Sequence, residues 1–306
     1  METTREIYWN VGHGVMLPMY ALVLLALGVL SFGVWKRIRV YRQGKALNRA
    51  DNLDERLVDA LKSALLQLKV FRVRGPGTAH GLFFWGFLTL LAGTTLIFIQ
   101  ADLLEPLFGI RFLEGRFYLL FSLALDLAGA TALLMLGGLF IRRYLIRPEG
   151  LETGRDDALM HALLFAILIS GFAMEGARMA VTEMGTELSH WSPVGLLAAR
   201  ALGGMEEPAL RTLHGGLWWL HLVLTLGFIV SIPGTKFRHI LTTAANYVFV
   251  DRGPKGNLTT LNMEDDEAES FGAARIADLT WKDILDGDAC TGCKRCQDRC
   301  PAHATD

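Results

Sequence analysis

Residues 80–100 read HGLFFWGFLTLLAGTTLIFIQ, an apolar run without a single charged side chain. A helix needs about 20 such residues to cross a bilayer, because each residue rises about 1.5 Å and the hydrocarbon core is about 30 Å thick. Four further runs are long and apolar enough, at 11–35, 117–140, 158–176 and 213–233. The sequence therefore predicts an all-α membrane protein built around a bundle of five transmembrane helices.

The composition supports this prediction. Hydrophobic residues make up 52% of the 306 residues and charged residues 20%, with a mean hydropathy of +0.33. These values are too apolar for an ordinary soluble domain. The formal net charge is −1, so no excess of positive charge indicates binding to nucleic acid. The first run is too long for a cleaved signal peptide, and its flank METTREIYWN holds more acidic than basic residues.

Basic residues in the connecting segments predict the orientation. Such residues follow the first run in 36–45 and the third run in 141–155, and Lys236 and Arg238 follow the fifth. Because segments rich in Lys and Arg stay in the cytoplasm, we expect the N-terminus outside and the C-terminus in the cytoplasm. Between the first two runs, 51–73 has helical periodicity and charge, which predicts an amphipathic helix on the cytoplasmic membrane surface.

Histidines are concentrated in or beside the apolar runs, where polar groups are costly and usually functional. His221 and His239 are about five turns apart, so both imidazoles would leave the last helix on the same side if it continues to His239; the alternative is that Pro233 and Gly234 break it. His214 lies about two turns before His221 and falls close to that line. Two histidines from separate helices can hold a haem inside a bundle. The pattern thus predicts one or two b-type haems.

Depth in the membrane suggests the pairs. His80 opens the second run and His239 follows the fifth, so both are expected near the cytoplasmic boundary, where they could hold one haem. An outer haem has two alternatives. Either His13 and His214 hold it, since their depths are similar, or His221 holds it with a partner that the sequence does not identify.

Other polar groups in the runs have both a structural and a functional interpretation. Asp126 lies in the middle of the third run, and Glu175 and Arg178 close the fourth at a spacing that lets them pair. A protonatable carboxyl beside a quinone would support proton-coupled chemistry, whereas the structural alternative is an acid bonded to a neighbouring helix. We favour the structural alternative for Asp126, and a structural role for His161 and His190.

All four cysteines lie in one short segment, CTGCKRCQDRCP, with the spacing C-x2-C-x2-C-x3-C-P. Bacterial ferredoxins use this run to bind [4Fe–4S] clusters, and in two-cluster ferredoxins the fourth cysteine serves the other cluster. Zinc is the alternative, although zinc modules usually use two separated C-x2-C pairs. The predicted ligands are Cys290, Cys293, Cys296 and Cys300.

No second cysteine run follows, which leaves three interpretations. We expect the chain to be the front part of a longer polypeptide; the alternatives are a single cluster on these four cysteines and a partner that completes the site. The predicted parts are a membrane domain at 1–250, a polar linker at 251–278 and the start of a ferredoxin-like [4Fe–4S] domain at 279–306. Cysteines confined to one run also indicate a reducing compartment.

The layout of five runs and the segments around His80 and LHGGLWWLH…TKFRHI resemble the cytochrome b subunit of respiratory nitrate reductase. That family carries two histidines on its second helix and two on its last, and His80, His221 and His239 match three of them. The words FYLLFSLALDLAGA, EGAR, WSPVG and LHGGLWW, with the cysteine run, resemble membrane-bound heterodisulfide-reductase-related iron–sulfur proteins. This group includes electron transfer flavoprotein:menaquinone oxidoreductases, and the resemblance covers most of 7–306.

The resemblance implies a quinone-linked oxidoreductase of the bacterial inner membrane. A reduced electron transfer flavoprotein, or another cytoplasmic redox protein, would deliver electrons to the cluster, and they would pass through haem b to the menaquinone pool in the lipid. The alternative is a haem-free membrane anchor or assembly subunit that docks an iron–sulfur protein. A transporter is disfavoured by the cysteine run.

Overall fold

The computed structural model describes residues 4–254, 264, 272–298 and 300–303. Helices dominate, and within these ranges no strand forms beyond an isolated bridge between Lys45 and Thr280. Most of the predicted linker lies outside the described residues. The helices are α1 (Met16–Tyr41), α2 (Leu53–Leu66), α3 (Leu68–Phe71), α4 (Pro76–Phe98), α5 (Glu105–Phe108), α6 (Gly115–Ile141), α7 (Arg155–Thr182), α8 (Pro193–Leu202), α9 (Glu207–Ser231), α10 (His239–Val248) and α11 (Trp281–Asp288).

Short segments of tighter or wider helix connect or extend these elements. Two π-helical segments, η2 (Ile99–Leu104) and η3 (Arg142–Ile146), extend α4 and α6. The 3₁₀ segments are η1 (His13–Val15), η4 (Glu187–Trp191), η5 (Ile232–Gly234), η6 (Lys236–Arg238), η7 (Ile276–Asp278) and η8 (Pro301–His303).

Five of the helices are long and apolar enough to cross a membrane, and each overlaps one of the predicted runs. In their most apolar windows, only 6% to 28% of the residues are buried within the chain. The remaining apolar surface would be unstable in water and needs a hydrocarbon environment. The prediction of a helical membrane protein is confirmed. The spans are Met16–Tyr41, Pro76–Phe108, Gly115–Ile146, Arg155–Thr182 and Glu207–Gly234.

The chain forms two compact units. Unit 1 comprises 1–25, 70–148 and 153–228, and unit 2 comprises 26–69, 149–152 and 229–306. In unit 1, small residues let helices approach closely: a Cβ added at Gly86 of α4 would lie 2.7 Å from the Ala128 carbonyl oxygen of α6. A Cβ at Gly176 of α7 would lie 2.6 Å from the Cβ of Ala198 on α8. Close packing of this kind replaces the hydrophobic effect as the force between helices in lipid.

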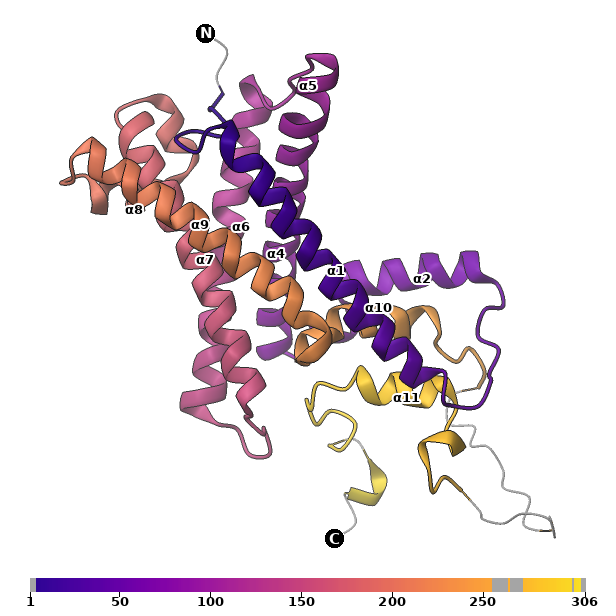
Figure 1. Cartoon of the computed structure of the whole chain (residues 1–306). Helices are drawn as coiled ribbons and strands as arrows, with labels where there is room; N and C mark the ends of the chain where they lie inside the picture. The colour runs from indigo at the N-terminus through magenta and orange to yellow at the C-terminus, as the bar shows by residue number, and fades with distance from the viewer. Residues whose placement is uncertain (1–3, 255–263, 265–271, 299, 304–306) are drawn as a thin grey trace. The chain divides into compact units, whose positions relative to one another are not determined.

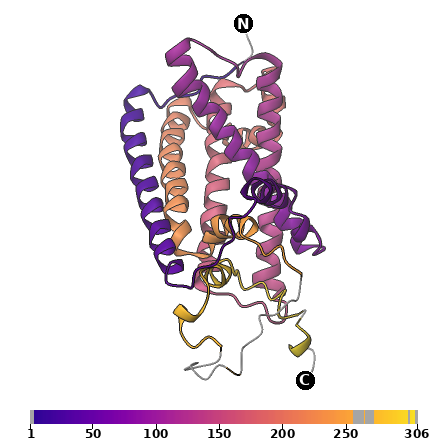
Figure 2. The same ribbon diagram turned by 90° about the vertical axis from the view of Figure 1, so that its right-hand side faces the viewer.

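In unit 2, α2 and α10 lie side by side in both views (Figure 1 and Figure 2). The buried Arg56 of α2 joins them, because its guanidinium donates to the carbonyl oxygens of Val248 and Val250 at 3.3 and 2.7 Å. The same guanidinium also binds the carboxylate of Asp51 and its backbone carbonyl. The C-terminal segment joins this unit through Lys45, whose backbone pairs with Leu279 and Trp281.

The predicted amphipathic helix at 51–73 is present but is divided in two. Gln67 adopts a left-handed conformation, with φ at 49°, between α2 and α3. Along α2, Leu57 and Leu61 are exposed, while Arg56 and Ala60 are buried. One face of α2 is therefore apolar and open, as an interfacial helix requires.

One premise of the histidine analysis is wrong: His221 and His239 do not share a continuous helix. The α9 helix ends at Ser231, and the chain passes through η5 and η6 before α10 begins at His239. Pro233 has no N–H for an intrahelical bond. Thr235 then adopts an extended conformation, and its hydroxyl accepts a hydrogen bond from the Phe237 N–H at 3.2 Å. The spacing of the two histidines therefore does not place their imidazoles on one side.

Arg56→Leu should destabilise the protein by about 1–3 kcal/mol, because the carbonyls of Val248 and Val250 lose the charged donor that the buried guanidinium supplies. Arg252→Leu is the matched control, since Arg252 binds Glu55 and Asp59 of the same helix at the surface. It should change stability by less than about 1 kcal/mol. Thermal unfolding in detergent measures both, and equal losses would contradict the role assigned to Arg56.

Candidate functional site

The four cysteines lie in one exposed loop of unit 2, after α11. The Gly292 N–H donates to the Cys290 Sγ at 3.4 Å, and Gly292 itself has a φ of 67°, which favours glycine. In the described part of the chain, no three Cys, His, Asp or Glu side chains are gathered tightly enough to hold a metal ion. The loop thus brings the thiols into one segment without closing them around a common centre.

Two side-chain contacts fix the cysteine loop to the rest of unit 2. The Arg295 guanidinium donates to the Lys69 carbonyl oxygen at 3.0 Å, and the Lys69 ammonium lies over the Tyr247 ring, 4.9 Å from its centroid. Burial raises the pKa of Tyr247, and the nearby Arg295 opposes that shift. Because Tyr247 belongs to α10, the cysteine loop is anchored to the helix that begins with His239.

The chemistry of this donor set fits an iron–sulfur cluster. Four thiols within one short loop can supply soft, anionic ligands, and an N–H bond to sulfur, as at Cys290, is one of the features that tune such clusters. Since the four side chains are exposed, a cluster here would be open to a donor from solution.

His239 starts α10 in unit 2. Its Nδ1 lies 2.7 Å from the Lys236 carbonyl oxygen, which can only accept, so Nδ1 carries the proton and Nε2 carries the lone pair. Burial lowers the pKa of His239, whereas the bond to Lys236 opposes that shift. The imidazole is therefore oriented by a backbone bond, as metal-ligating histidines usually are.

His221 has a similar arrangement in unit 1. Its Nδ1 lies 3.0 Å from the Ser170 hydroxyl, which also lies 3.1 Å from the Ile167 carbonyl oxygen. The hydroxyl can donate its one proton to either partner, so this contact orients the ring and allows either tautomer. Gly171 provides space beside the ring, because an added Cβ would lie 3.4 Å from the His221 Cε1. Ser170 was not identified from the sequence.

The other predicted haem ligands are less completely defined. His214 is buried, its Nδ1 has no hydrogen-bond partner among the described residues, and its ring meets the edge of Trp9 at 4.8 Å between centroids. The side chain of His13 lies outside what the structure describes. His80 lies near the start of α4 in unit 1, whereas His239 belongs to unit 2, so their pairing stays a prediction.

The two histidines for which we favour structural roles differ in their surroundings. The His161 Nδ1 lies 2.7 Å from the Asp157 carbonyl oxygen, and its ring packs edge-on against Phe140 and Tyr144. His190 lies on η4 and is exposed. A backbone bond to Nδ1 therefore also occurs at a histidine outside the predicted haem sites, so it fixes a tautomer without proving ligation.

Asp126 on α6 caps the N-terminus of α8. Its two carboxylate oxygens accept bonds from the backbone N–H groups of Val194 and Gly195 at 3.0 and 2.8 Å. Next to it, the hydroxyls of Ser122 and Ser192 lie 2.8 Å apart. A negative charge at a helix N-terminus satisfies free N–H groups and interacts favourably with the helix dipole. These contacts give Asp126 a structural function within unit 1.

A buried ionic cluster lies at the end of α7. Glu175 and Arg178 approach to 3.9 Å, but Arg178 makes a closer pair with the buried Glu183. Arg5 interacts electrostatically with all three, and its pKa is lowered by burial and then by Arg178. The sequence indicated the Glu175–Arg178 pair but missed Arg5 and Glu183, because neither lies at helical spacing from it.

Curated relatives match the chain along nearly its whole length. It is 35% identical over 296 residues to an EtfAB:quinone oxidoreductase from Syntrophomonas wolfei, covering 94% of this chain and 40% of that protein. It is 26% identical to the probable iron–sulfur-binding oxidoreductase FadF of Bacillus subtilis, covering 94% and 41%. It is also 26% identical to a probable membrane-anchored ferredoxin of Chromohalobacter salexigens, covering 95% and 39%.

The chain thus spans about 40% of the length of the curated relatives it matches. No family model matches the sequence, and no solved structure matches it. The similarities relate the chain to oxidoreductases and extend over 94% of its length.

Asp126→Asn should destabilise the protein by about 1–2 kcal/mol, because an amide offers one acceptor oxygen where the carboxylate offers two. Thermal unfolding and hydrogen exchange at the Val194 and Gly195 amides measure the effect. Ser122→Ala is the control in the same cluster, and it should leave both amides protected. An Asn variant with full stability and protected amides would contradict the capping role.

Proposed function

We propose that this chain transfers electrons between a cytoplasmic redox protein and menaquinone in the membrane. The observation that carries the proposal is that the cysteine loop and His239 lie in the same compact unit, unit 2. The exposed cysteine loop is anchored through Arg295, Lys69 and Tyr247 to α10, which begins with the oriented imidazole of His239. The cysteines proposed to bind the cluster and the imidazole proposed to bind haem thus belong to one compact unit.

The relatives support the same function. One is named as a quinone oxidoreductase of EtfAB, one as an iron–sulfur-binding oxidoreductase and one as a membrane-anchored ferredoxin. We infer that the donor is an electron transfer flavoprotein or a similar cytoplasmic protein. The chain lies in a bacterial inner membrane with the cysteine loop in the cytoplasm, in agreement with the distribution of basic residues.

Each predicted ligand has a defined task. Cys290, Cys293, Cys296 and Cys300 would hold a [4Fe–4S] cluster, which supplies one-electron chemistry when bound. His80 and His239 would hold a haem b near the cytoplasmic boundary, and an outer haem would use either His221 or the pair of His13 and His214. The protein orients these ligands: the carbonyl of Lys236 holds the Nδ1 proton of His239, and the hydroxyl of Ser170 contacts Nδ1 of His221.

The ionic cluster of Glu175, Arg178, Glu183 and Arg5 is proposed to exchange protons with a quinone, whereas Asp126 is held by the α8 amides. A haem-free membrane anchor is the alternative function. It is favoured if purified protein, recovered in full, shows no b-type absorption bands in reduced-minus-oxidised spectra.

The cysteine loop should bind about four iron and four acid-labile sulfide per chain. Cys293→Ser should reduce both contents, because one soft anionic ligand is lost. Thr291→Ala in the same loop is the control and should keep them. Elemental analysis and electron paramagnetic resonance of the reduced protein measure the result. Zinc bound without sulfide would contradict the cluster.

His80→Ala and His239→Ala should each abolish the same low-spin haem signal, because one lost axial ligand leaves that haem five-coordinate. His161→Ala and His190→Ala are controls for histidine removal and should keep the full haem content. Absorption and paramagnetic resonance spectra measure the signal. Unchanged spectra in the first two variants would rule out this pair of ligands.

A further inference from the structure

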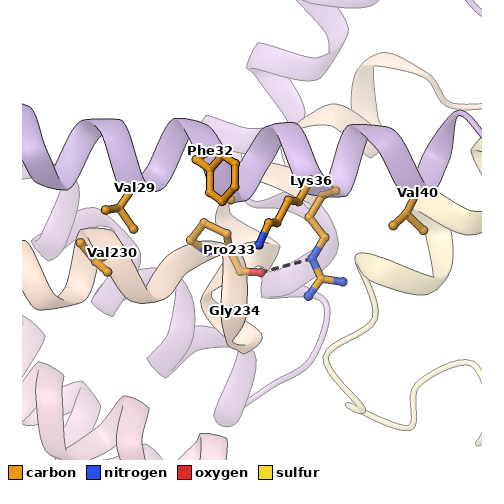
Figure 3. A pocket seen from close by; sticks show the side chains of 9 residues that line it. Val29, Phe32, Lys36, Val40, Val230, Pro233 and Gly234 are labelled. Atoms are coloured by element: carbon orange, nitrogen blue, oxygen red, sulfur yellow. Dashed lines mark hydrogen bonds between the residues drawn. The ribbon is translucent and has the colours of Figure 1, made fainter.

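A groove opens in unit 2 between α1 and the segment that ends α9. It has a volume of about 410 Å³, within the range of small-molecule sites. Figure 3 shows Val29 and Phe32 of α1 on one side, with Val230 and Pro233 on the other. The close approach of the two walls depends on Gly33, since a Cβ there would lie 2.6 Å from the Pro233 side chain.

Two cations lie at one end of this apolar groove. The Lys36 ammonium lies 4.6 Å from the centroid of the Phe32 ring, and among the described residues it pairs with no carboxylate. The neighbouring Arg37 already has partners within the protein. Its Nε donates to the Pro233 carbonyl oxygen at 3.3 Å, and its Nη1 lies 3.4 Å from Asp288. Lys36 therefore has an ammonium group that can donate to a ligand in the groove.

Asp288 connects the groove to both proposed redox elements. Its carboxylate binds Arg37, accepts a 2.5 Å bond from the Tyr41 hydroxyl and lies 3.3 Å from the Arg238 guanidinium. Arg238 directly precedes His239, and Asp288 lies two residues before Cys290. The groove, the start of α10 and the start of the cysteine loop thus converge on one carboxylate.

The charges around the groove are unbalanced. Arg37 and Arg238 share one carboxylate, that of Asp288, and Lys36 adds a further positive charge, so the surroundings carry excess positive charge. A partly buried positive environment stabilises negative charge that develops on a bound ligand. The apolar walls at Val29, Val230 and Pro233 favour a ligand that is otherwise hydrophobic.

We propose that this groove binds the headgroup of menaquinone, with its isoprenoid chain leading into the lipid and one carbonyl oxygen accepting a bond from Lys36. The inference rests on the proposed function and gives it a substrate site. Reduction to the quinol takes two electrons, delivered singly by the cluster and haem proposed above, and two protons from cytoplasmic water. These convert the two carbonyls into hydroxyls.

Filling the groove tests the site. Val29 and Ile38 are branched residues of α1 that are 41% and 40% exposed, but only Val29 lines the groove. Val29→Trp should weaken binding of a menaquinone with one isoprenyl unit by about tenfold or more, because the indole occupies the space of the headgroup. Ile38→Trp should bind like the wild type. Titration calorimetry of the oxidised full chain in detergent measures the dissociation constant.

Removing the cation tests the donor. Lys36 and Arg39 both lie over aromatic rings of α1, Lys36 over Phe32 and Arg39 over Trp35, at 4.6 and 4.9 Å from the centroids. Lys36→Gln should weaken quinone binding by about tenfold, which is the effect of losing a charged hydrogen-bond donor. Arg39→Gln should leave it unchanged. Equal affinities for all four variants would overturn the proposal.

The binding measurement separates this inference from the proposed function, since oxidised quinone binds whether or not electrons can reach it. If a chain that contains neither cluster nor haem binds menaquinone with full affinity, the groove is supported as the quinone site and the electron pathway is rejected. Intact redox centres with unchanged quinone affinity in Val29→Trp would reject the groove alone. Mass spectrometry supplies a further outcome: a phospholipid retained by the wild type and lost from Val29→Trp, with quinone affinity unaltered, would assign the groove to lipid.

Discussion

Hydrocarbon offers no water to polar groups, and this constraint governs the arrangement of charge in the protein. Each buried charge therefore needs several partners within the chain. The two oxygens of Asp126 accept two backbone bonds at the start of α8, and Arg178 contacts two glutamates. In unit 2, the buried guanidinium of Arg56 binds one carboxylate and donates to three backbone carbonyls. Multiple bonds of this kind hold the short α8 and α2 helices against their neighbours.

The same constraint explains which features the sequence could predict. Hydropathy is a property of consecutive residues, so the five spans followed directly from the apolar runs. Contacts between residues distant in sequence could not be predicted in this way, because the bonds of Arg56 to Val250 and of Ser170 to His221 depend on how the helices pack. Pro233 showed where α9 could end, but the extended Thr235 and the new start at His239 follow from local capping. For the cysteines, spacing predicted the ligand set, whereas the anchor through Tyr247 required the structure.

Within unit 2, a single carboxylate organises elements that are far apart in sequence. Asp288 ends α11 and binds residues of α1 and of the segment that precedes α10. The fixed charge of Asp288 is thus offset by two arginines, which lowers the cost of placing it beside an apolar groove. Since the first cysteine follows two residues later, the position of the cysteine loop depends on the same ion pairs.

The two locations proposed for quinone chemistry have different energetic consequences. The predicted topology puts Lys36 at the cytoplasmic end of α1 and the Glu175 cluster at the outer end of α7. Electrons that arrive from the cytoplasmic cysteine loop and meet protons from the same side at Lys36 cross little of the membrane potential. Electrons that continue to the Glu175 end would move from the negative cytoplasmic side to the positive outer side, which releases about 2.3 kcal/mol per charge for each 100 mV. Quinone reduction in a groove beside Asp288 would therefore be nearly independent of the membrane potential, whereas reduction at the Glu175 end would be driven by it.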